Sequence, residues 1–194
     1  VADIPKPERY DAPSLHAALE ATLTAMRDGA DVVFQGSFFD GRFHGRSDFL
    51  VRVGEQYAVH DTKLAKHAKI TALLQLAAYA HQLEINGIPV HDDVTLVLGD
   101  GAESVHAVGD IIPVYLERRS RLEKILDEHQ AEDCPVAWND PRYLACGRCD
   151  ICEAEVNAHR DLLLVANLRV SQRTHLRAAG IETIDALATS TGKV

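Results

Sequence analysis

The fold of this chain follows from one stretch, RSDFLVRVGEQYAVHDTKL at positions 46–64. It contains two runs rich in β-branched and aromatic residues, 46–53 and 57–64. A Gly-Glu pair between them is typical of a tight turn. The stretch therefore predicts two short strands that pair in antiparallel fashion.

Regular elements are expected on both sides of this hairpin. Apolar residues recur at spacings of three and four in several segments, which predicts helices, and shorter apolar runs bounded by turn residues predict strands. The expected elements are a helix at 14–29 capped by Ser14, a strand at 32–39, a helix at 70–86, strands at 94–98 and 104–108, a helix at 111–129 and short helices within 162–189. This order predicts an α/β fold, with a mixed sheet flanked by helices.

Composition limits the classes of protein that fit. The formal net charge of −9 argues against a protein that coats nucleic acid, because such binding depends on Lys and Arg. Basic residues still recur locally, at Arg42, Arg46, Arg52, Lys63, Lys66 and Lys69. No apolar run approaches the length of a membrane span, and the first residues do not form a signal peptide. We expect a cytoplasmic protein with no membrane partner.

Two carboxylates and a lysine are expected to converge on one face of the hairpin. Side chains alternate along a strand, so Asp61 and Lys63 project from the same side. Asp48, on the neighbouring strand, can lie beside Asp61. Carboxylate oxygens suit Mg²⁺, which activates water, and a lysine stabilises charge that develops on a phosphate. An Asp-x-Lys tripeptide alone is more often a solvated strand face.

Three ordered motifs strengthen this interpretation. They are GRSDFL at 45–50, HDTKL at 60–64 and QLAAYA at 75–80. In this order and at this spacing they resemble the RecB-like branch of the PD-(D/E)xK nuclease superfamily, over roughly residues 14–190. The resemblance implies a restriction-endonuclease-like fold and a Mg²⁺- or Mn²⁺-dependent deoxyribonuclease that acts on single- or double-stranded DNA.

The resemblance also implies residue roles. Asp48 and Asp61 would bind the metal, together with the Thr62 carbonyl, and Lys63 would be the catalytic lysine. Gln75 and Tyr79, one helical turn apart, would order the site or the DNA. The family uses one further ligand from an upstream helix. We assign Glu20 to this role, although His16 and His44 are alternatives and the ligand is also expected before residue 1 in related proteins.

Four cysteines predict a second metal centre. Cys134, Cys146, Cys149 and Cys152 follow a C-x11-C-x2-C-x2-C pattern. Three thiolates at such short spacing favour a [4Fe-4S] cluster, and Zn²⁺ is the alternative. Some RecB-like nucleases carry such a cluster, usually with one cysteine before the core. We expect this centre to stabilise an irregular segment rather than to take part in catalysis.

The chain is therefore expected to have three parts. Residues 1–129 would form the nuclease core, 130–160 the four-cysteine segment, and 161–194 a tail that resembles a helix-hairpin-helix unit. In the tail, Gly180 would make the turn and Thr183 would cap the second helix. The backbone of such a turn binds DNA phosphates, and a plain helical hairpin is the alternative.

Three functions remain open at this point. The first is a DNA nuclease, and the second is a catalytically weak nucleic-acid-binding or scaffolding module. The third is a metal-binding regulator that works through its cysteines. The chain begins with Val rather than Met, so we expect a piece of a longer DNA-processing protein, with helicase or other domains as partners.

Overall fold

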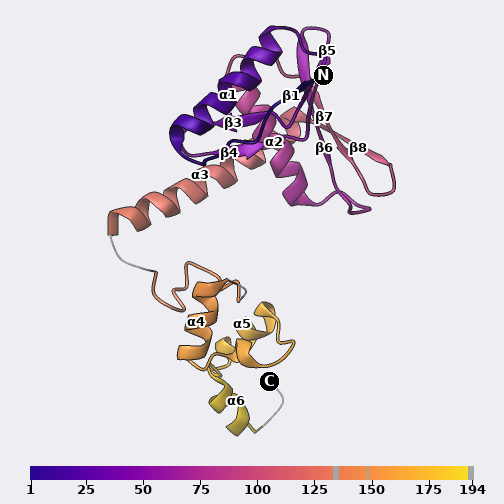
Figure 1. Cartoon of the computed structure of the whole chain (residues 1–194). Helices are drawn as coiled ribbons and strands as arrows, with labels where there is room; N and C mark the ends of the chain where they lie inside the picture. Colours follow the sequence, from indigo (N-terminus) through magenta and orange to yellow (C-terminus); the bar gives the residue numbers. More distant parts are fainter. Residues whose placement is uncertain (133–135, 148, 192–194) are drawn as a thin grey trace. The chain divides into compact units, whose positions relative to one another are not determined.

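The computed structural model describes residues 1–132, 136–147 and 149–191 (Figure 1). The chain forms two compact units, Val1–Leu126 and Asp127–Val194. In the described part of the chain, no helix is both long enough and apolar enough to cross a membrane.

The first unit is built on a mixed six-stranded sheet, as the sequence predicts. Its strands run in the order β1 (Ala2–Asp3), β2 (Val32–Phe34), β5 (Phe49–Val53), β6 (Gln56–Thr62), β7 (Asp93–Val97) and β8 (Glu103–Ala107). The β1–β2 and β6–β7 pairs are parallel, and the other pairs are antiparallel. The central β5–β6 pair is the predicted hairpin, with Leu50 opposite Val59.

Two of the predicted strands are each divided in two. The run 32–39 forms β2 and β3 (Ser37–Phe39), and the run 46–53 forms the end of β4 (His44–Arg46) and then β5. β3 and β4 pair in a separate two-stranded sheet. The division occurs where the chain leaves one sheet for the other, and there Gln35 adopts a left-handed φ of 55°. Unbroken strands were therefore a wrong prediction at these two places.

Helices α1 (Ala12–Arg27), α2 (Ile70–Ile85) and α3 (Val108–Glu132) accompany the sheet. α1 packs against β2 and β3, and α2 packs against β6 and β7. The predicted cap of α1 is wrong, because the helix begins earlier and Asp11 caps it by accepting a hydrogen bond from the Ser14 amide at 3.0 Å. A proline in the first turn costs no hydrogen bond, which explains how Pro13 fits there.

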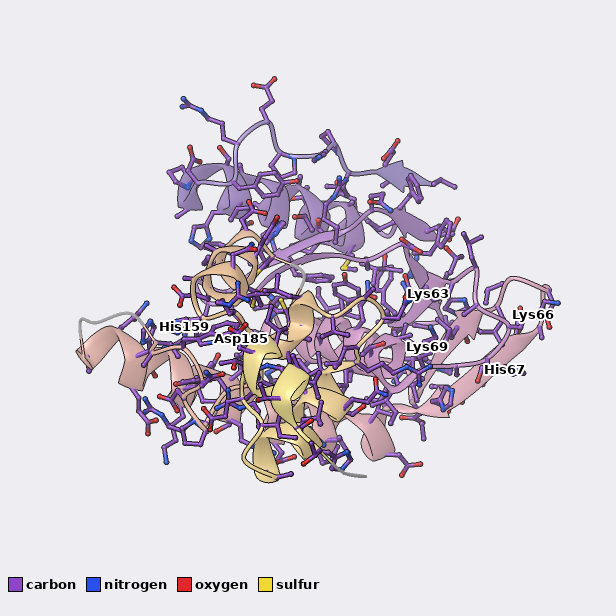
Figure 2. The ribbon with its side chains drawn as sticks, turned by 90° about the horizontal axis from the view of Figure 1, so that it is seen from below. Lys63, Lys66, His67, Lys69, His159 and Asp185 are labelled. Carbon is purple, nitrogen blue, oxygen red and sulfur yellow. The ribbon has the colours of Figure 1, made fainter. Side chains whose placement is uncertain are left out.

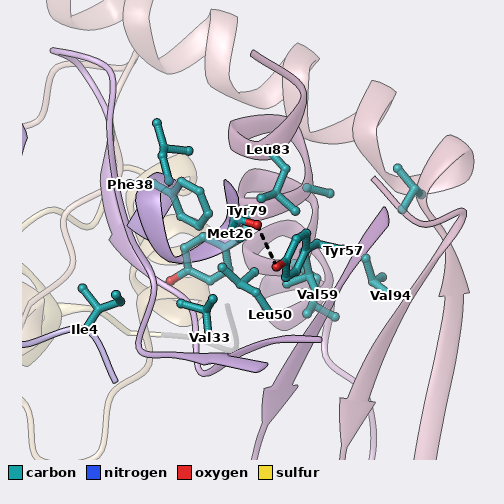
Figure 3. Packing of buried hydrophobic residues seen from close by; sticks show 14 of the residues in the cluster. Ile4, Met26, Val33, Phe38, Leu50, Tyr57, Val59, Tyr79, Leu83 and Val94 are labelled. Carbon is teal, nitrogen blue, oxygen red and sulfur yellow. Dashed lines mark hydrogen bonds between the residues drawn. The ribbon is translucent and has the colours of Figure 1, made fainter. Parts of the chain in front are cut away.

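The core of the first unit lies between the helices and the sheet (Figure 3). Its fully buried aliphatic residues come from α2 and from the central strands, and include Val33, Leu50, Val59, Leu76, Leu83, Val94 and Leu96. The hydroxyl of Tyr57 lies within hydrogen-bond distance of the carbonyls of both Met26 (3.3 Å) and Ala30 (2.7 Å), which fixes the end of α1 to the sheet. This core fixes the positions of β5, β6 and α2, the elements that carry or adjoin the three motifs.

The second unit is small and helical. It contains α4 (Asp150–Ala158), a 3₁₀ turn η1 (Leu162–Leu164), α5 (Val170–Ala178) and α6 (Ile184–Thr189). As predicted, Gly180 makes the turn between α5 and α6 with a φ of 81°, and Thr183 caps α6 by accepting from the Ala186 amide at 3.1 Å. Arg173 on α5 forms a buried ion pair with Asp161 at 2.6 Å. This arginine is therefore part of the interior of the unit.

Candidate functional site

The structure brings Asp48, Asp61 and Lys63 together at the end of the central hairpin. Asp61 lies on β6, and Asp48 directly precedes β5. Phe49 pairs with His60 in this antiparallel hairpin. Asp48 precedes Phe49 and Asp61 follows His60, so the two aspartates lie side by side. The side chain of Asp61 is 1% exposed, and its Oδ2 forms an ion pair with the Lys63 ammonium group.

The two carboxylates differ in their hydrogen bonding. Asp48 Oδ2 accepts from the amide (3.0 Å) and the hydroxyl (2.8 Å) of Thr62, and its Oδ1 accepts from the side-chain amide of Gln35 at 3.3 Å. Asp61 Oδ2 has the Lys63 ammonium group as its partner, and the buried Oδ1 has no hydrogen-bond partner among the described residues. Asp61 and Lys63 therefore form a close ion pair, with the Asp61 carboxylate in the interior of the fold.

This difference moves the pKa values of the pair in opposite directions. Burial raises the pKa of Asp61, and the adjacent Asp48 carboxylate raises it further, against the opposing effect of Lys63. Burial also tends to raise the pKa of Asp48, but its contacts with Asp61, Thr62 and Lys63 outweigh this and lower it. A buried carboxylate and a partly buried one side by side repel one another, so the pair favours either a shared proton or a cation.

Gln75 and Tyr79 of α2 support the segment that carries Asp48. The Tyr79 hydroxyl donates to the Arg46 carbonyl at 2.6 Å, and Gln75 Nε2 donates to the same hydroxyl at 3.2 Å. Burial raises the pKa of Tyr79, so the hydroxyl keeps its proton for this bond. Both residues therefore position the Asp48 segment, and Gln75 also lines a cavity that Lys63 borders.

The candidates for a further ligand make other contacts in the structure. Glu20 is exposed on α1 and its carboxylate is 3.8 Å from Arg27. The ring of His16 packs against Phe39 with centroids 4.9 Å apart, and the ring of His44 packs against Tyr10 at 5.4 Å. Among the described residues, no third histidine, cysteine or carboxylate completes a three-ligand group with Asp48 and Asp61.

The acidic pair fits a hard divalent cation by its chemistry. Oxygen ligands suit Mg²⁺ and Mn²⁺, and Mg²⁺ commonly binds through one or two carboxylates and several waters. Asp61 is nearly completely buried, its Oδ1 has no hydrogen-bond partner among the described residues, and a cation would satisfy this oxygen. Asp48 and Asp61 are therefore the residues that could hold such an ion, and Thr62 orients Asp48.

Three cysteines form a second candidate site in the other unit. The Sγ atoms of Cys146, Cys149 and Cys152 lie within 4.8 Å of one another, with 3.6 Å between those of Cys146 and Cys152. Cys149 caps α4, and its sulfur accepts from the Cys152 amide at 3.5 Å. The predicted fourth ligand, Cys134, lies outside the described residues. The group could bind a metal ion.

Sequence reasoning missed two residues that shape the acidic site. Gln35 holds Asp48 through its side chain, and its amide donates to the Asp48 carbonyl at 3.0 Å. Gly45 lies so close to α2 that a Cβ there would be 2.8 Å from the rings of both Phe43 and Tyr79. A Gln-Gly pair in the middle of a predicted strand was the available signal for the first. For Gly45, the motif at 45–50 contains the glycine but no signal of its close packing against α2.

Comparison with models of known protein families finds no match to this chain, and comparison with curated proteins finds none. We therefore base the functional proposal on the geometry of the two candidate sites.

Proposed function

We propose that the first unit is a metal-dependent deoxyribonuclease of the RecB type, with a restriction-endonuclease-like arrangement of its strands. The observation that carries the proposal is the nearly completely buried Asp61, paired with Lys63 and adjacent to Asp48. Burying a carboxylate is costly unless an opposite charge or a bound ion compensates.

Each residue has a role that its contacts support. Asp48 and Asp61 hold the divalent cation, which when bound activates water and neutralises charge on the phosphate. Lys63 keeps its ammonium group beside Asp61 and stabilises negative charge that develops on the phosphate. Thr62 and Gln35 fix the orientation of Asp48, while Tyr79 fixes the backbone that precedes it.

A cleavage assay tests this proposal. Labelled linear single-stranded, linear duplex and circular DNA are incubated with Mg²⁺ or Mn²⁺ and the chain, and with its Asp61→Asn, Lys63→Met and Glu20→Gln variants. We expect the first two variants to lose at least about 100-fold in rate, the scale seen when a charge-stabilising group is removed. Glu20→Gln keeps the rate, because Glu20 faces solvent. Equal rates in the unmodified chain and Asp61→Asn would refute the assignment.

A second function is favoured by one observation, the lack of a third ligand beside the acidic pair among the described residues. A site of two protein ligands holds a cation more weakly than a site of three, and a weakly held cation slows turnover while leaving nucleic-acid binding intact. In that case the unmodified chain binds labelled DNA in a gel-shift assay, with or without a divalent cation, and no substrate is cut.

We infer that the cysteine group holds a structural metal ion, and its geometry favours a single Zn²⁺. Four sulfurs at about 2.3 Å from one Zn²⁺ lie roughly 3.8 Å apart in a tetrahedron. The 3.6 Å between Cys146 and Cys152 agrees with this spacing. In a [4Fe-4S] cluster each thiolate binds a different iron, which holds the sulfurs farther apart. Elemental analysis and the visible absorption spectrum distinguish one zinc per chain from four irons.

A further inference from the structure

The segment between β6 and α2, residues 63–69, carries four basic side chains close to the acidic pair. They are Lys63, Lys66, His67 and Lys69, and Figure 2 shows them along this segment. This concentration contrasts with the chain's net charge of −9. A net negative charge is enough to keep a protein soluble, so solubility does not explain a basic segment in an acidic chain.

Most other basic residues near the site already have partners. Arg46 donates to the carbonyls of Ile4 (2.6 Å) and Gln35 (3.4 Å), and Arg52 donates to the carbonyls of Gly29 and Gly54. Lys63 pairs with Asp61. By contrast, Lys66 and Lys69 are exposed and form no ion pair with the residues that the structure describes. Their charges are therefore available to a ligand.

The basic segment is held in place by the end of β7. The Lys63 amide donates to the Val97 carbonyl at 2.9 Å, and the Gly99 amide donates to the Ala65 carbonyl at 3.1 Å. Gly99 has no space for a side chain, because a Cβ there would overlap the Leu64 backbone. A ligand that binds this segment therefore meets a loop anchored at its start, which lowers the entropic cost of binding.

A cavity of about 230 Å³ opens between this segment and the first turn of α2. Its lining includes Lys63, Leu64, His67, Lys69, Thr71 and Gln75. No side chain caps the N-terminus of α2, and its first turn contains no acidic residue. The partial positive charge of this helix end adds to that of the lysines. The cavity thus presents basic side chains and a helix N-terminus to the same space.

Two exposed apolar residues flank the basic ones. Leu64 is 98% exposed and Ile70 is 74% exposed. Apolar side chains next to lysines suit a ligand that has both an anionic backbone and apolar faces, as a nucleic-acid strand has. Inorganic anions would use the lysines alone.

We propose that the cavity at the start of α2, with Lys69 in its lining and Lys66 exposed on the same segment, forms a phosphate-binding subsite for the strand that enters the acidic site. This proposal rests on the proposed nuclease function for its substrate class. Lys63 borders both the cavity and Asp61, so a phosphate in the cavity is connected to the reacting phosphate along one strand. The subsite sets the position of the strand and contributes no sequence preference.

Binding measurements test the subsite independently of cleavage. Fluorescence anisotropy follows a labelled single strand and the matching duplex in Ca²⁺ buffer at several KCl concentrations. The variants are Lys66→Gln, Lys69→Gln and the double variant. Lys6→Gln is the matched control, because Lys6 is an exposed lysine near the N-terminus that lies over the ring of Tyr10.

Each lost phosphate contact lowers the slope of log K against log salt by about 0.7 for a single strand and about 0.9 for a duplex. We expect this drop in each single variant, twice this drop in the double variant, and no change in Lys6→Gln. The proposal is overturned if the double variant keeps the slope of the unmodified chain, if Lys6→Gln loses as much, or if the unmodified chain binds neither DNA. Binding through these lysines without cleavage by the unmodified chain would overturn the nuclease alone and leave the subsite standing.

Discussion

The two units of this chain are stabilised in different ways. The first unit buries a continuous aliphatic core between α1, α2 and the six-stranded sheet. In the described part of the second unit, the buried apolar residues are Cys152, Val156 and Leu162. The second unit contains instead the buried ion pair of Arg173 with Asp161 and the Cys146–Cys149–Cys152 group, which could bind a metal ion, and we propose that both stabilise it.

This difference follows from size. A short segment cannot bury enough apolar surface to offset the conformational entropy lost on folding, so small units use metal ions or polar networks as cross-links. The Arg173 side chain shows the pattern, because it contacts Asp161 and Asn139 and lies over the ring of Trp138 at 5.2 Å. Loss of a cross-link should therefore unfold the second unit and leave the first intact.

Metal removal gives the largest expected effect. A strong chelator, or Cys152→Ser, should abolish the folded state of the second unit, because metal binding and folding are coupled in sites of this kind. Hydrogen exchange measured by mass spectrometry then shows loss of protection in α4, α5 and α6, while β5, β6 and β7 stay protected. Unchanged protection of α4 in metal-free protein, verified by elemental analysis, would contradict the proposed role of the cysteines.

The buried ion pair gives the next largest effect. Arg173→Ala leaves Asp161 buried and without its partner, and breaking such a pair costs about 3 to 5 kcal/mol. Arg160→Ala is the matched control, because it removes an arginine that pairs with Asp185 on the surface and should change stability far less. Trp138, the only tryptophan, reports denaturant unfolding of the second unit. Equal losses in the two variants would refute the distinction.

A smaller effect is expected in the first unit, at Asp40. Its carboxylate contacts Arg119 (2.9 Å) and Gln82 (2.7 Å). Burial raises its pKa, but these contacts and the amides of Arg42 and Phe43 lower it to about 2. This depression corresponds to roughly 2 kcal/mol of stability at neutral pH, which Asp40→Asn should remove.

The pH dependence at Asp40 has a definite sign. The pKa in the folded state is lower than in the unfolded chain, so the stabilisation is complete above about pH 4 and disappears as the pH falls toward 2. The stability difference between the unmodified chain and Asp40→Asn should therefore shrink over this range. Glu55→Gln, in the exposed β5–β6 turn, is the control. A difference that stays constant from pH 7 to pH 2 would show that the carboxylate charge is irrelevant.

Local patterns in the sequence were enough to predict most elements of the first unit. The β5–β6 hairpin and α2 follow from apolar periodicity and turn residues, and the proximity of Asp48 to Asp61 follows from strand pairing. The tail was predicted in similar detail, since Gly180 and Thr183 occupy the turn and cap positions expected of them.

The contacts between distant segments could not be predicted in this way. The breaks at Gln35 and Ser47 arise because β3 and β4 pair with each other outside the main sheet. Alternation of side chains along one strand does not predict which strands will pair. The support of Arg46 by Tyr79 depends on how α2 crosses the sheet. Burial of Asp61 and exposure of Lys66 and Lys69 likewise become visible only in three dimensions.

Binding of Mn²⁺ to the first unit tests the central claim most directly, since it examines the acidic pair without assuming a substrate. Titration with Mn²⁺, with free ion followed by electron paramagnetic resonance, compares the unmodified chain with Asp48→Asn, Asp61→Asn and Glu20→Gln. We expect one site per chain that both aspartate variants lose and Glu20→Gln keeps. The two aspartates lie side by side, whereas Glu20 is exposed beside Arg27. Unchanged binding in Asp61→Asn would contradict the account.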